Sequence, residues 1–200
     1  MAADIMKTLE SILEKMNLIE AGEIPNIDLY MDQVTTFMES HLGNLKRNPE
    51  DKVLTKTMIN NYAKNDLLPS PEKKKYSKNH VLLLTFIYYF KNVLSISDIK
   101  TLMRQITENH FKTESTPNLE DIYREVVKFQ PEIVDMVQKD LKEKEDLANS
   151  SFADVKGEEG EHLRYFALLC MLCIDVYIKK TLVEAVIDSM GAGEDEKKDK

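Results

Sequence analysis

Apolar residues recur at every third or fourth position along most of the chain, with charged residues between them. This period is typical of amphipathic helices, whereas no strand-like alternation of useful length occurs. The pattern therefore predicts an all-α fold. The predicted helices are Asp4–Ile19, Asp28–Leu42, Lys56–Lys64, Lys78–Asn92, Asp98–Thr107, Leu119–Phe129, Glu132–Leu147 and Glu161–Met190.

Polar residues at the helix boundaries support these assignments. Thr55 and Ser77 are good N-caps, and Ser95 or Ser97 can cap the helix that follows. Two prolines in the segment Leu67–Glu72 exclude a helix there, because each lacks a backbone donor. The only candidate strands are short pieces that flank Pro69–Lys75.

Two segments, Val81–Phe90 and Phe166–Ile178, are the most apolar in the chain. Both are shorter than the roughly 18 residues that a membrane helix needs, so we interpret both as buried core helices. The final predicted helix is apolar nearly all round, which indicates either a central place in the core or a surface shared with a second subunit. The charged segment Gly191–Lys200 is predicted to be a disordered tail.

Composition narrows the class of protein further. Of the 200 residues, 42% are hydrophobic, which excludes a disordered chain and is enough for one domain or two small ones. Two Cys cannot make a disulfide scaffold, and the first residues lack the features of a signal peptide. We therefore expect a cytoplasmic protein with no membrane span.

The formal net charge of -8 argues against nucleic-acid binding only if it is evenly spread. It is not, because Leu45–Lys91 holds ten Lys and Arg against four Asp and Glu. That segment carries about +6 and the rest of the chain about -14. The sequence thus places a basic segment within an acidic body.

The basic segment has the residue types that bind nucleic acid. The short helix Lys56–Lys64 has a polar outer side that suits a major groove, where Lys contacts phosphates and Asn pairs with adenine. The Pro-containing turn and the lysines after it suit a small wing that contacts phosphates. The alternative for the lysine run alone is a solvated loop.

Four motifs in this region resemble the winged-helix DNA-binding domain of MerR-type regulators. They are Lys56–Lys64, Leu67-Leu68-Pro69, Lys75-Tyr76-Ser77 and Leu94–Lys100. The resemblance covers about residues 25–105. It is closest to an uncharacterised bacterial family, a domain of unknown function with a MerR-like DNA-binding domain, which is similar over Ile24–Gln33.

The resemblance implies a winged helix-turn-helix that binds double-stranded DNA as a dimer and regulates transcription. It implies an N-terminal helix (1–24), a winged-helix domain (25–110), a C-terminal helical region for dimerisation or a small-molecule effector (118–190) and the tail (191–200). The DNA-binding residues implied by position are Thr55, Lys56, Thr57, Asn60, Asn61, Lys64, Lys73, Lys74, Lys75 and Tyr76.

An alternative function uses the same scaffold without DNA. The Arg that usually precedes the Tyr in the MerR pattern is replaced by Asn60-Asn61, and the loop before Lys56 is long. A helical protein-interaction adaptor would keep the fold and lose the DNA contacts, since a fold does not fix a function.

No pattern in the sequence indicates an enzyme, a metal or a cofactor. The four His have no ligand spacing, and neither a phosphate-binding Gly-rich loop nor a nucleophile elbow occurs. Cys170 and Cys173 form a C-x-x-C in the middle of a predicted helix, with no third ligand near. We interpret both as small apolar residues of the core.

Overall fold

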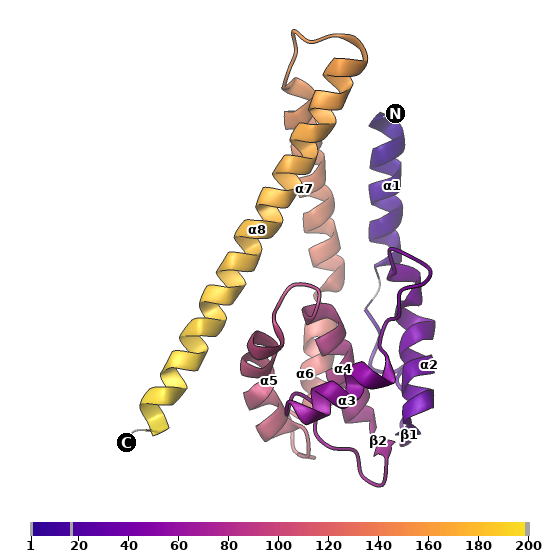
Figure 1. Cartoon of the computed structure of the whole chain (residues 1–200), viewed down its shortest axis with the longest axis vertical. Helices are drawn as coiled ribbons and strands as arrows, with labels where there is room; N and C mark the ends of the chain where they lie inside the picture. The colour runs from indigo at the N-terminus through magenta and orange to yellow at the C-terminus, as the bar shows by residue number, and fades with distance from the viewer. Residues whose placement is uncertain (1, 17, 199–200) are drawn as a thin grey trace. The chain divides into compact units, whose positions relative to one another are not determined.

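The computed structural model describes residues 2–16 and 18–198, and it is mostly helical (Figure 1), which confirms the predicted all-α class. The chain divides into two compact units. Unit 1 consists of Met1–Asn17 and Phe129–Val183, and unit 2 of Leu18–Lys128 and Glu184–Lys200. The N-terminal helix thus groups with the C-terminal helices, apart from the domain that was predicted to follow it.

Unit 1 contains α1 (Ala2–Lys15), α7 (Gln130–Ser150) and the first part of α8 (Gly157–Lys198). Pro131 lies in the first turn of α7, where a missing N–H costs no helical hydrogen bond. The next helix, α8, begins at Gly157, whose φ of 74° lies in the left-handed region. It continues beyond Met190 into the segment predicted to be a disordered tail; Asp199 and Lys200 lie outside the described residues.

Unit 2 has five α-helices and a small sheet within residues 18–128. The caps agree with the sequence, because α3 begins after Thr55, α4 after Ser77 and α5 after Ser95. The elements are β1 (Leu29–Tyr30), α2 (Met31–Leu42), the 3-10 turn η1 (Gly43–Leu45), α3 (Lys56–Lys64), β2 (Lys75–Tyr76), α4 (Lys78–Phe90), α5 (Ile96–His110) and α6 (Leu119–Val127).

The sheet joins two segments that are distant in sequence. β1 and β2 are antiparallel, with Leu29 opposite Tyr76 and Tyr30 opposite Lys75. β2 lies at the end of the region where short strands were predicted, whereas β1 was not predicted. A two-residue strand is too short to show an alternating pattern.

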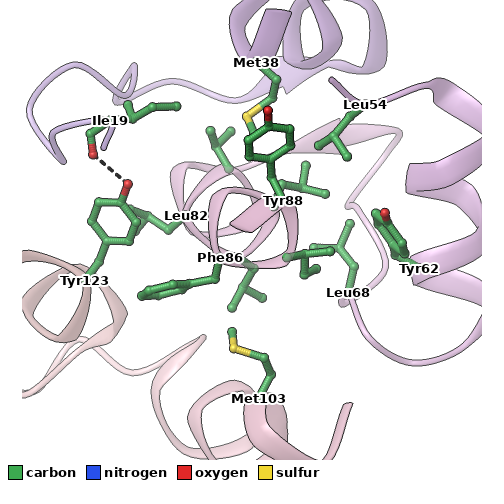
Figure 2. Packing of buried hydrophobic residues seen from close by; sticks show 14 of the residues in the cluster. Ile19, Met38, Leu54, Tyr62, Leu68, Leu82, Phe86, Tyr88, Met103 and Tyr123 are labelled. Atoms are coloured by element: carbon green, nitrogen blue, oxygen red, sulfur yellow. Dashed lines mark hydrogen bonds between the residues drawn. The ribbon is translucent and has the colours of Figure 1, made fainter. Parts of the chain in front are cut away.

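The core of unit 2 surrounds α4, as Figure 2 shows for Leu82, Phe86 and Tyr88. Every residue from Val81 to Tyr88 is buried, so the interpretation of this segment as a core helix is confirmed. Tyr123 of α6 is 1% exposed, and its hydroxyl donates to the carbonyl of Ile19 at 2.6 Å. This contact joins α6 to the segment that precedes β1, and both lie in unit 2.

The second apolar segment behaves differently, and its interpretation as a buried core helix is wrong. Leu168 is buried, but Phe166 is 61% and Tyr177 69% exposed. Cys173 is also exposed, so it is not a core residue, while Cys170 is half-buried. The apolar residues do recur along α8, but among the described residues none covers the side on which Phe166 and Tyr177 lie.

Candidate nucleic-acid interface

α3 is fixed to unit 2 by one side and presents the other side to solvent. Ile59 is fully buried and Tyr62 is 6% exposed, which anchors the helix. α3 contains no acidic residue, so its outer side combines cations with amides and a hydroxyl. The five exposed residues of that side are Lys56, Thr57, Asn60, Asn61 and Lys64.

Thr55 has a structural role at the start of α3. Its Oγ1 accepts a hydrogen bond from the N–H of Met58 at 3.1 Å, which satisfies one of the free donors of the first turn. The hydroxyl is therefore engaged in capping. The role of Thr55 is to fix the start of α3, and its hydroxyl is not directed at a ligand.

The long loop between α2 and α3 is held by two charged side chains. The Glu39 carboxylate accepts from Lys46 Nζ at 2.5 Å and from the Val53 N–H at 3.2 Å. The hydrogen bond from Lys46 is the main reason that the pKa of Glu39 is lowered. From the other side, Lys91 Nζ donates to the Val53 carbonyl at 2.8 Å, and burial lowers the pKa of Lys91. The sequence analysis identified neither Glu39 nor Lys91, because their partners are backbone atoms or residues that are not close in the sequence.

A shallow depression of about 530 Å³ lies beside the first turn of α3. Its rim includes Lys52 and Lys56, and hydroxyls from α2 line one side. The spacing of Thr36 and Ser40, four residues apart, places both on one side of α2 and could have indicated this surface. The depression is lined by Thr35, Thr36, Glu39, Ser40, Lys52, Leu54, Thr55 and Lys56.

The lysine run forms the tip of a tight hairpin. The Lys75 N–H donates to the Glu72 carbonyl at 2.8 Å, and these two residues form a β-bridge. Between them, Lys73 and Lys74 have φ values of 49° and 64°. Positive φ at both central positions is the geometry of a type I′ turn, for which Asn and Gly are preferred. Both lysines are exposed, so two cations occupy a strained tip.

Tyr76 does not belong to this surface. It is 3% exposed, and its ring meets the His80 ring edge-on with the centroids 5.5 Å apart. Because successive side chains of a strand point to opposite sides, the partly exposed Lys75 and the buried Tyr76 lie on opposite sides of β2, with Tyr76 on the core side. Tyr76 is therefore removed from the candidate contacts.

A series of contacts connects the start of α3 with the hairpin. Lys56 forms an ion pair with Asp32, in the first turn of α2. Two residues earlier, the ring of Tyr30 lies 5.5 Å from Lys75 Nζ. Lys56 and Lys75 therefore lie near the same edge of unit 2. Lys64 is at the other end of α3, about 12 Å away along the helix axis.

Other kinds of site are not evident in the described residues. Within residues 2–16 and 18–198, no group of three or more His, Cys, Asp or Glu could hold a metal ion. In the same part of the chain, no helix is both long and apolar enough to cross a membrane.

Unit 2 thus defines a small helical domain built around one buried helix, with a two-stranded sheet and an exposed basic edge. The chain belongs to the family described as a domain of unknown function, DUF1836, which matches residues 19–126. The matched region coincides closely with the first segment of unit 2. No curated protein and no solved structure matches the chain.

Proposed function

We propose that unit 2 is a winged helix-turn-helix that binds double-stranded DNA and regulates transcription. In this proposal α3 enters the major groove and the hairpin around Lys73 and Lys74 lies along the sugar-phosphate backbone. The observation that carries it is the outer side of α3. There, exposed Lys and Asn side chains stand on a firmly anchored helix without any carboxylate.

The residue types suit this division of roles. The amides of Asn60 and Asn61 can each accept and donate a hydrogen bond, which is the pattern that adenine presents in the major groove. Lys56 and Lys64 stand at the two ends of α3 and can contact phosphates on either side of the groove. The ion pair with Asp32 keeps Lys56 at the start of the helix until DNA replaces it.

The hairpin tip supports a functional role for its lysines. A left-handed conformation costs roughly 1–2 kcal/mol for a residue with a side chain, and Gly would avoid that cost. Strained positions of this kind persist where the side chain is needed. Two adjacent lysines at such positions are well suited to phosphate contacts, as the MerR-like residue order also suggests.

The first experiment is selection of bound sequences from random duplex DNA, followed by affinity measurements at several salt concentrations. We expect a recurring sequence and a strong decrease in affinity with salt. Lys73→Gln with Lys74→Gln should weaken binding to all sequences and reduce the slope of log affinity against log salt by about 0.9 for each lysine–phosphate pair that is removed. Asn60→Ala should instead relax the preference at one base pair.

The matched control removes two lysines elsewhere. Lys139 and Lys142 of α7 are 72% and 64% exposed, so Lys139→Gln with Lys142→Gln changes the net charge equally. If this control weakens binding as much as the hairpin variant, the hairpin is not the contact. Failure to bind duplex DNA at about 50 mM salt would overturn the proposal and favour the protein-interaction adaptor.

A further inference from the structure

A buried histidine lies where the hairpin joins α4. His80 is 4% exposed, and the ring of Tyr76 meets its imidazole edge-on with the centroids 5.5 Å apart. The carbonyls of Pro69 and Ser70 also lie near enough to affect its pKa. Because these three residues all belong to residues 69–76, which we call the hairpin segment, that segment covers one side of the imidazole.

The imidazole contributes to the cap of α4 in its neutral form. Nδ1 of His80 accepts a hydrogen bond from the Ser77 N–H at 3.0 Å, and the Ser77 hydroxyl lies 2.9 Å away. The proton of the neutral ring is therefore on Nε2, which is buried and has no hydrogen-bond partner in the described part of the chain. A second proton would occupy Nδ1, remove the acceptor for the Ser77 N–H and leave a charged ring away from water. The closed arrangement thus favours neutral His80.

Carboxylates from two other segments act on the same ring. Asp28 lies immediately before β1, and Glu72 belongs to the hairpin segment. Burial lowers the pKa of His80, whereas the nearby carbonyls and these two carboxylates raise it by less. The Tyr76 phenol stays neutral near pH 7, because burial raises its pKa. His80 in the closed structure therefore binds a proton less readily than a solvated imidazole does.

The surrounding helices bring further groups to this joint. Phe111, which follows α5, presents an uncharged ring whose centroid lies 4.8 Å from that of the imidazole. The preceding His110 bonds instead to the Pro117 carbonyl, with Nδ1 and the oxygen 2.6 Å apart. Lys78 of α4 pairs with Glu120 of α6 at 2.8 Å, so these two charges offset each other. We therefore assign titration of the joint to the buried imidazole.

We propose that His80 is a pH-sensitive switch, and that its protonation in mildly acidic solution releases the hairpin segment from the start of α4. In the open state water reaches the imidazole, which then binds a proton with its ordinary pKa of about 6.5. Water also supplies an acceptor for the Ser77 N–H. The alternative is an opening at Phe111, which would leave the hairpin segment closed.

The consequence for DNA rests on the proposed function. Lys73 and Lys74 lie at the tip of the hairpin segment, so its release would take these two cations out of their fixed positions. Phosphate contacts should then weaken in proportion to the open population. The opening itself is measured without DNA, so the switch and the proposed DNA binding can each fail alone.

The experiment is amide hydrogen exchange of the full chain by nuclear magnetic resonance, between pH 7.5 and pH 5.5. The reporter is the Lys75 N–H, which donates to the Glu72 carbonyl in the closed hairpin. After correction for the intrinsic effect of pH, we expect its protection to fall about three- to tenfold, since a solvated imidazole sets a limit of about tenfold at pH 5.5. Urea up to about 1 M should not change this protection, because a local opening exposes little surface.

Two substitutions assign the effect. His80→Gln keeps an acceptor for the Ser77 N–H, as in a capping box, and does not titrate, so protection at Lys75 should no longer depend on pH. His162→Gln is the matched control, since His162 is exposed in unit 1, and it should retain the wild-type response. Protection at Lys75 that is unchanged by pH in the wild type, or that falls equally in His80→Gln, would overturn the proposal.

Discussion

Tyr123 connects two segments that are far apart in the chain. Its hydroxyl donates to the Ile19 carbonyl within the core, and burial raises the pKa of the phenol. We expect Tyr123→Phe to lower the free energy of unfolding by about 1–3 kcal/mol, because the buried carbonyl is left without its partner. Urea unfolding at a fixed protein concentration measures this. Tyr30→Phe is the control, since Tyr30 is 55% exposed and should change stability by less than about 0.5 kcal/mol.

His80 should make stability depend on pH. It is 4% exposed, and burial lowers its pKa, which nearby carbonyls and carboxylates only partly oppose. In the unfolded chain His titrates near about 6.5, so below that pH the unfolded state binds more protons than the folded state. We therefore expect the free energy of unfolding to decrease from about pH 7.5 to about pH 5.5, and His80→Gln to reduce this decrease. An unchanged pH dependence in the variant would contradict the assignment to His80.

At the residue scale the sequence was informative about polar positions and less so about apolar and aromatic ones. The polar residues between Ile59 and Tyr62 had to face outward once those two were buried. Tyr76 was ambiguous, because its ring suits a core and its hydroxyl suits a phosphate. Its place was decided by pairing with Leu29, which is distant in sequence.

Among the elements, the hairpin at Lys73 and Lys74 offers the sharpest test of strain. Replacing the pair by Asn-Gly, the residues that a type I′ turn prefers, should raise the free energy of unfolding by about 1–2 kcal/mol. The same variant should bind DNA more weakly if the lysines contact phosphates. Lys64→Gly is the comparison, because it places Gly in the last turn of α3 and should lower stability by about 0.5–1 kcal/mol. Equal effects on stability in both variants would argue against strain at the tip.

The helices could be predicted well from the period and the caps, because both are local properties. α3 was predicted at its observed bounds, since Thr55 and the apolar positions Ile59 and Tyr62 all specify it. The sheet could not be predicted, because β1 has two residues and its partner lies more than forty residues later. The end of α8 was underestimated, since residues such as Ala192 and Glu194 also favour helix.

At the scale of the whole molecule, the sequence left two alternatives for the last helix: a central core position or a shared surface. The exposure of Phe166 and Tyr177 excludes the first for the described structure. The charge distribution also acquires a structural meaning, because the whole basic segment Leu45–Lys91 lies in unit 2. The strongly acidic remainder includes α7, which is rich in Asp and Glu.

The two units should also differ in how they unfold. Unit 2 has a continuous buried core around α4, whereas the described residues of unit 1 bury few side chains. Because helices obtain most of their stability from packing, unit 1 should open before unit 2. Hydrogen exchange in urea, followed for α7 and α4, should show α7 opening at the lower urea concentration. A single transition shared by both helices would contradict the unequal stability of the units.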